Sequence, residues 1–146
     1  MTDPRSLSGL DQLRTMMAGK APPPPMAATM AFVLSDAAEG MALFTGSPGK
    51  AHLNPMGAVH GGWYGAILDS AMGCAVHSTL APGAAYTTLE YKINITRAIP
   101  PGTQVTCRGE VQHRGRSTAV ARAEITGADG RVYGTGSTTC MILAAP

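Results

Sequence analysis

One carboxylate in this sequence lies where a charge is costly. Asp69 is the only charged residue between Gly61 and Val76, a run that is otherwise apolar or small. A carboxylate inside an apolar helix costs several kcal/mol unless other groups compensate for it. Because chains rarely carry that cost without a chemical reason, we expect the function of the protein to depend on this segment.

The residues around Asp69 predict a sharp turn followed by one long helix. Asn54-Pro55 is a turn signal, and the glycines after it break regular structure. A helix is then expected from Gly61 to about Thr79, and Pro82-Gly83 stops it. Since this helix is apolar on nearly all sides, it must be buried on most of them.

The segment before the turn predicts one short helix and two strands. Leu7 to Met17 has a helical pattern, with Ser8 as a plausible cap, and Pro22 to Pro25 is expected to be an extended tether. Thr29 to Ser35 and Gly40 to Gly46 read as two short strands.

After the helix the hydrophobic pattern has a period of two, which predicts four consecutive strands linked by hairpins. In the first of them, alternation places Thr88 and Glu90 on one face and Thr87 on the other. Small residues in the later strands leave room for something bulky against the sheet, namely Ala119, Ala121, Ala123, Gly134 and Gly136. The simplest arrangement is α+β, a curved antiparallel sheet of five to six strands wrapped around the helix. We expect residues 1–146 to form one such domain, with the short helix and tether at residues 7–25.

Composition narrows the possible functions. A net charge of +2 is too small to indicate a nucleic-acid partner. The three cysteines form no CxxC pair and are expected to be free thiols in a reducing cytoplasm, and no secretory signal is visible. Asp69 argues against a membrane span. No pair among the four histidines has metal-ligand spacing, so no metal is expected.

The pattern N-x-x-G-x-x-H-G-G, with an Asp nine residues after the His, resembles the PaaI-like branch of the hotdog-fold acyl-CoA thioesterases. The matching positions are Asn54, Gly57, His60, Gly61, Gly62 and Asp69. The proline tether, Asn94 in its strand and the turn Arg114-Gly115-Arg116 extend the resemblance along nearly the whole chain from Leu7. The family often has Arg-Pro after that strand, whereas here Arg97 is separated from Pro100.

The resemblance implies hydrolysis of an aryl- or medium-chain acyl-CoA without a cofactor. Asp69 would act as nucleophile or as general base for water, and the backbone N–H of Gly61 would polarise the thioester carbonyl. Asn54 would supply a second donor or hold the water. His60 would organise the turn, with direct catalysis as the alternative. These groups would come from different subunits of a homodimer, expected to pair into a homotetramer.

Further residues are expected to contact the substrate. Gly62 lies beside the carbonyl site. Either Thr88 and Glu90 or Thr87 could face the substrate and assist the reaction, and a role in packing alone is the alternative for each of them. Arg97, Arg114 and Arg116 could pair with the phosphates of CoA. The acyl pocket would be lined from the helix by Trp63, Tyr64, Ile67 and Leu68.

Two other functions are alternatives to hydrolysis. A hotdog dehydratase acting on hydroxyacyl thioesters would carry differently spaced His and acidic residues, which are not seen here. A non-catalytic acyl-CoA binding or sensing module would be better served by an apolar residue in place of Asp69.

Overall fold

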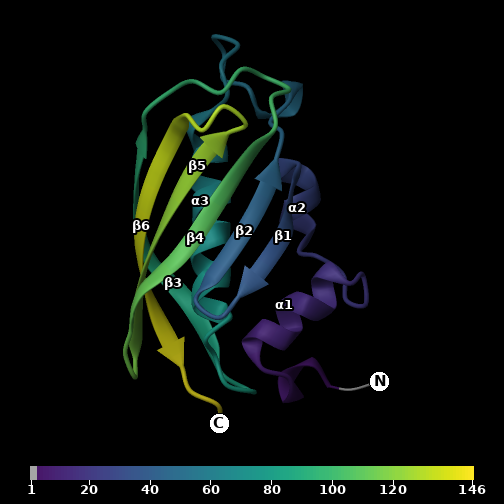
Figure 1. Ribbon diagram of the computed structural model, residues 1–146, viewed down its shortest axis with the longest axis vertical. Helices are drawn as coiled ribbons and strands as arrows, with labels where there is room; N and C mark the ends of the chain where they lie inside the picture. Colours follow the sequence, from purple (N-terminus) through teal and green to yellow (C-terminus); the bar gives the residue numbers. More distant parts are fainter. Residues whose placement is uncertain (1–2) are drawn as a thin grey trace.

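A single long helix lies across one face of a six-stranded sheet in the computed structural model, which describes residues 3–146 (Figure 1). This helix, α3, runs from Gly61 to His77, two residues shorter than the sequence predicts. Ten of its residues are buried, among them Ile67, Leu68 and Met72. The nearly continuous apolar character of α3 therefore reflects burial on most of its sides.

All six strands pair antiparallel, in the order β1-β2-β4-β5-β6-β3. Their bounds are β1 Phe32–Ala38, β2 Met41–Gly46, β3 Ala85–Ile95, β4 Val105–Arg114, β5 Thr118–Gly127 and β6 Val132–Leu143. The sheet curves around α3, so the α+β hotdog arrangement predicted from the sequence is confirmed.

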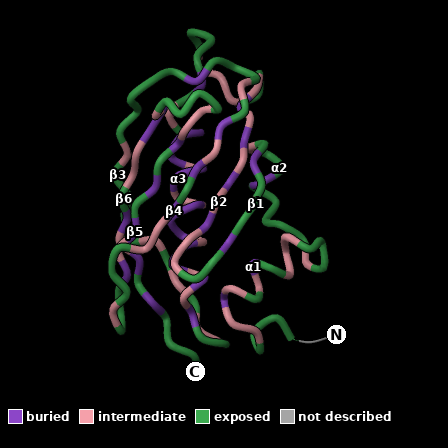
Figure 2. Tube along the Cα trace, viewed as in Figure 1, coloured by how far each residue is buried: buried purple, intermediate pink, exposed green. Residues whose placement is uncertain are grey.

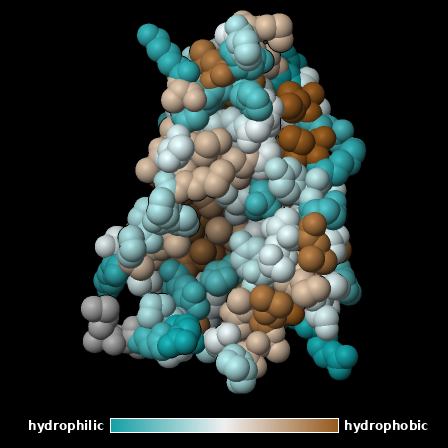
Figure 3. Space-filling view, turned by 180° about the vertical axis from the view of Figure 1, so that it is seen from behind, coloured by the Kyte–Doolittle hydropathy of each residue, from teal (hydrophilic) through white to brown (hydrophobic). Residues whose placement is uncertain are grey.

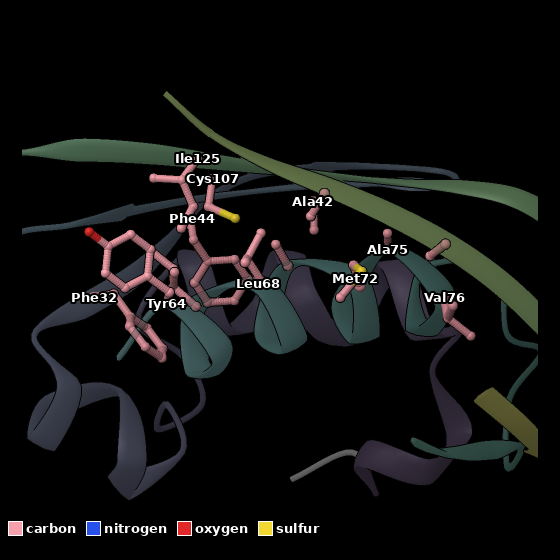
Figure 4. Packing of buried hydrophobic residues seen from close by; sticks show 14 of the residues in the cluster. Phe32, Ala42, Phe44, Tyr64, Leu68, Met72, Ala75, Val76, Cys107 and Ile125 are labelled. Carbon is pink, nitrogen blue, oxygen red and sulfur yellow. The ribbon is translucent and has the colours of Figure 1, made fainter. Parts of the chain in front are cut away.

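Small side chains on the inner face of the sheet let α3 approach the strands closely. A side chain at Gly109 of β4 would collide with the backbone carbonyl of Ala71, and one at Gly136 of β6 would meet the Met72 side chain. Figure 4 shows residues of α3, including Leu68 and Met72, pointing into the space beneath the sheet. Burial is concentrated in α3 and the inner strand positions (Figure 2).

The N-terminal segment contains an additional helix that the sequence pattern did not predict. After the 3₁₀ turn Pro4–Ser6, α1 runs from Gly9 to Met17 and is capped by Ser8, as expected. The extended tether ends at Pro24, because Pro25 is the first residue of α2 (Pro25–Met30). The expected strand start at Thr29 is therefore wrong. Ala31, at a φ of 53°, ends α2, and β1 begins at Phe32.

Strand β3 forms one edge of the sheet and contains a β-bulge. The pairing with β6 shifts between Thr88 and Glu90, so Leu89 has no partner. Thr88 contacts α3 on the inner face, and so does Tyr91 beyond the bulge. The expectation that Thr88 and Glu90 share a face is wrong, because a bulge adds one residue and reverses the alternation.

In the part of the chain that the structure describes, no helix is both long and apolar enough to span a lipid bilayer. Cys74, Cys107 and Cys140 are free thiols; Cys107 and Cys140 are buried, and Cys74 is half-buried.

We expect Gly109→Ala to destabilise the protein by about 3 kcal/mol, because neither the strand nor the helix backbone can yield to the added methyl group. Urea unfolding monitored by circular dichroism measures this change. Gly49→Ala is the matched control, since Gly49 has extended backbone and open space around its Cβ position. Equal stability of the two variants would contradict the close contact between helix and strand.

Candidate active site

The loop before α3 is held in shape by Asn54. Its side-chain oxygen accepts hydrogen bonds from the backbone N–H groups of Met56 and Ala58, at 3.0 and 3.1 Å. An isolated bridge between Leu53 and Val59 closes the same loop. Within residues 3–146 no acceptor takes a hydrogen bond from the Asn54 amide nitrogen, so this group remains able to donate to a ligand.

His60 is the N-cap of α3. Its Nδ1 accepts a hydrogen bond of 2.8 Å from the Gly62 N–H. A side chain at Gly62 would crowd the same ring nitrogen, which explains the second glycine of the pair. The ring therefore organises the turn, as the resemblance implies.

This cap leaves the Gly61 N–H as the donor at the start of α3. Gly61 is half-buried, and within the described chain its N–H donates to no acceptor. The first N–H groups of a helix lie at the positive end of its dipole, where they stabilise negative charge. The geometry suits a carbonyl oxygen that becomes an oxyanion.

Asp69 lies in the middle of α3, half-buried, with Oδ1 accepting a hydrogen bond of 3.0 Å from the Thr88 hydroxyl. Burial raises the pKa of Asp69 above its ordinary value, and the hydrogen bond from Thr88 partly opposes that increase. No cation forms an ion pair with Asp69 in residues 3–146. A partly desolvated carboxylate of this kind is more basic than one in water.

Two tyrosines flank Asp69, and the sequence analysis missed both. The Tyr91 hydroxyl lies 3.0 Å from the position of a Cβ at Gly65, and the Tyr86 hydroxyl lies against Gly73. These glycines are four residues before and after Asp69, so all three lie on one face of α3. The glycine–aspartate–glycine spacing was the available signal for close contact on either side of the carboxylate.

Within one chain, Asp69 and the Gly61 N–H are too far apart to act on the same carbonyl group. Eight residues of α-helix separate them, about 12 Å along the axis. A single copy therefore presents two half-sites, one at the start of α3 and one at its centre.

The prediction that four large residues of α3 line the acyl pocket is wrong. Trp63, Tyr64, Ile67 and Leu68 are buried in the core beneath the sheet. The Trp63 indole donates to the Met30 carbonyl at 2.7 Å, and the Tyr64 hydroxyl donates to the Arg97 carbonyl. The helix residues left partly exposed are different and small, chiefly Ala66, Ser70 and Cys74. Sequence alone did not indicate which side of an all-apolar helix would stay uncovered.

The remaining expected ligand contacts are dispersed. Glu90 lies on the other side of the bulge from Thr88, and its carboxylate accepts the Thr139 N–H. Arg97 follows β3 near the start of α3, where its carbonyl accepts from Tyr64. Arg114 contacts Thr79 at the opposite end of α3, and Arg116 is exposed on the same turn. One copy therefore does not bring the three arginines together.

Within residues 3–146, no three His, Cys, Asp or Glu side chains lie close enough together to hold a metal ion.

Similar solved structures share this fold. A phenylacetic acid degradation-related protein of Ralstonia eutropha, described as a candidate thioesterase, is 31% identical, with a TM-score of 0.81 over 88% of this chain and 98% of that chain. A hypothetical thioesterase of Streptococcus pneumoniae, solved with coenzyme A, is 27% identical, with a TM-score of 0.72 over 79% and 91% of the chains. The PaaI protein of Escherichia coli, 23% identical, has the same fold, with a TM-score of 0.81 over 96% and 98%.

No curated protein sequence matches the chain. Residues 56–133, more than half of the chain, match the family model described as the thioesterase superfamily. They include the His60 cap, the Gly61 N–H and the Asp69–Thr88 pair. With the fold and the similarity to the Ralstonia eutropha protein, this match shows that the chain belongs to the thioesterase superfamily.

Proposed function

We propose that this protein is an acyl-CoA thioesterase that hydrolyses an aryl- or medium-chain acyl-CoA to the free acid and CoA, without a cofactor. The observation that carries the proposal is Asp69. It is half-buried on the uncovered side of α3, unpaired with any cation in residues 3–146, and oriented by the Thr88 hydroxyl. The solved relative with coenzyme A supports CoA as the carrier of the acyl group.

Two routes fit the position of Asp69. In the first, a carboxylate oxygen attacks the thioester carbonyl carbon, the C–S bond breaks, and water hydrolyses the resulting mixed anhydride. In the second, Asp69 removes a proton from water, and the water oxygen forms the new C–O bond directly. In both routes the electron pair of the broken bond goes to sulfur, which leaves as the CoA thiolate and is then protonated.

Each site is proposed to combine Asp69 of one copy with the Gly61 N–H and the Asn54 amide of another. The separation of the two half-sites within one chain supports this arrangement. The free edge of β3 also supports it, because Leu89, Tyr91 and Ile95 are about half exposed there, as expected of a strand that pairs with a second copy. Two such homodimers would form the tetramer.

A second copy would also bring the separated arginines to one substrate. Arg97 lies near the start of α3, whereas Arg114 and Arg116 lie near its end. If the helices of two copies run antiparallel, the arginines at opposite ends approach each other, and we propose that they bind the phosphates of CoA. We place the reaction in the cytoplasm, where free thiols persist.

The alternative function is a non-catalytic acyl-CoA binding or sensing module. It would share the fold and the arginines but would gain nothing from Asp69, whose ionised form is destabilised by burial. A measurement of thioester turnover therefore distinguishes the thioesterase from the binding module.

The first test is release of CoA from phenylacetyl, hydroxybenzoyl, short-, medium- and long-chain acyl thioesters, read by chromatography. We expect turnover by the native protein and a loss of about a hundredfold or more in Asp69→Asn, because the catalytic carboxylate is removed. Asp69→Asn should fold at least as stably, since a desolvated charge is removed, and thermal unfolding checks this. Binding of acyl-CoA without turnover would establish the binding module instead.

A second prediction concerns the Gly61 N–H. Gly61→Pro removes this donor at the first helical position, where proline is tolerated. We expect kcat to fall by about 10²–10³-fold, as for loss of an oxyanion donor. Gly61→Ala keeps the N–H and is the matched control, and equal activity of the two variants would rule out the donor role.

Mixing the two inactive variants tests the shared site. A heterodimer of Asp69→Asn and Gly61→Pro contains one site with both defects and one with neither. Random reassociation should therefore restore about a quarter of native activity, because half of the dimers are mixed and each has one intact site. If both groups came from the same copy, no activity would return.

Thr88 should set the pH at which Asp69 becomes active. Its hydrogen bond lowers a pKa that burial raises, so Thr88→Val should increase the pKa of Asp69 further. Because the reaction needs the ionised carboxylate, the acid limb of kcat should move to higher pH, and the loss of activity should be largest on that acid limb. Thr87→Val, on the exposed neighbour, is the control and should leave the pH profile of kcat unchanged.

A further inference from the structure

An apolar groove lies on the side of α3 that the sheet leaves uncovered. It has a volume of about 460 Å³ and is bounded by the end of α1, the prolines before α2, strand β1 and α3. Its lining includes Met16, Met17, Pro23, Met26, Ser70 and Cys74. Figure 3 views the molecule from behind the sheet, and hydrophobic surface lies at the bottom of a hollow near the middle of that face.

The groove begins next to the proposed catalytic carboxylate. Ser70, which lines it, follows Asp69 directly, and Cys74 lies on the next turn of α3. At 3.6 residues per turn, Ala66 projects between Asp69 and Ser70. Because Ala66 is small and partly exposed, a chain attached to a carbonyl at Asp69 can cross it into the groove.

Within the described residues, the side chains that line the groove offer no charge and no strong hydrogen-bond donor. Among residues 3–146 no charged side chain borders the groove, and the Ser70 hydroxyl already donates to the Ala66 carbonyl at 2.7 Å. Burial raises the pKa of Cys74 to about 12, so its thiol stays neutral. A hydroxyl or carboxylate placed here would lose its water without a replacement partner.

The walls favour a flexible hydrocarbon over a rigid ring of fixed shape. Three methionines line the groove, and their unbranched side chains adapt to irregular or variable apolar partners. Two of them, Met16 and Met17, belong to α1, and the third belongs to α2. The N-terminal segment therefore forms one side of the groove and α3 forms the other.

We propose that this groove binds the acyl chain of the substrate, that the preferred chain is an unsubstituted aliphatic one of medium length, and that the groove belongs to the copy that supplies Asp69. The inference rests on the proposed thioesterase function. It replaces the core residues expected from the sequence with a surface built by α1, α2 and α3. It also gives the N-terminal segment a role in selecting the substrate.

The native protein is tested with butanoyl-, hexanoyl-, octanoyl-, decanoyl- and 4-hydroxyphenylacetyl-CoA. We expect kcat/KM to rise by about fourfold for each added methylene until the groove is full, because each buried methylene contributes a constant increment. The hydroxylated ring should be a poorer substrate than octanoyl-CoA. A profile that is flat in chain length, or a preference for the hydroxylated ring, would overturn the inference.

Variants that fill the groove test whether the acyl chain binds in it. Cys74→Phe fills it from α3, and Met17→Trp fills it from the last turn of α1. Both should lower kcat/KM for octanoyl- and decanoyl-CoA by tenfold or more while leaving butanoyl-CoA nearly unchanged. If Cys74→Phe fails to fold, Met17→Trp still decides the matter. An equal effect on all chain lengths, or no effect, would refute the assignment.

A matched pair of methionine truncations provides the control. Met26→Ala opens the groove and should shift the optimum to longer chains. Met56→Ala removes the same side chain from the loop before α3, where it is 89% exposed, and should leave the profile unchanged.

Binding measurements show whether the groove assignment fails or the proposed thioesterase function fails. Calorimetry should show that octanoyl-CoA binds native protein at least tenfold more tightly than acetyl-CoA, and that Met17→Trp removes the difference. If the native protein hydrolyses no thioester but shows this difference, the thioesterase proposal fails and the groove assignment stands. If it hydrolyses thioesters but binds both equally, the groove assignment fails alone.

Discussion

The close packing of α3 against the inner face of the sheet is the contact on which the rest of the structure depends. It requires Gly109 opposite the Ala71 carbonyl and small residues along the neighbouring strands. Because one side of α3 is committed to the sheet, a ligand can approach the centre of the helix along the flank that the sheet leaves partly exposed. Asp69 lies there, between a strand edge that supplies Thr88 and an N-terminal segment that forms an apolar wall.

The bulge at Leu89 links the edge of the sheet to the chemistry of the site. Without it, Thr88 and Tyr91 would lie on opposite faces of β3, and only one of them could contact α3. With it, Thr88 binds Asp69 while Tyr91 packs against Gly65. The bulge in β3 thus allows the strand both to donate a hydrogen bond to the carboxylate and to pack closely against the helix.

The sequence predicted the helix, the strands and their packing because periodicity and small residues report directly on burial. Asp69 was singled out as an isolated charge and Asn54 as part of a turn signal, whereas the roles expected of Asn54, His60 and Gly61 came from the resemblance to a family. Three features were not predictable in this way. α2 lacks a polar cap, the bulge at Leu89 has no glycine or proline to mark it, and an all-apolar helix does not reveal its uncovered side. These features depend on tertiary contacts, so single-sequence patterns do not show them.

The glycines of α3 also bear on the order in which the protein folds. Four of its seventeen residues are glycine, and the two in its interior, Gly65 and Gly73, each lower helix propensity by about 1 kcal/mol relative to alanine. An isolated segment with this composition would have little helical structure, because helix nucleation is already unfavourable in short peptides. We therefore expect α3 to become helical only as the strands close around it. Gly65 and Gly73, which admit the tyrosines beside Asp69, thus favour a folding order in which α3 forms late rather than as the nucleus.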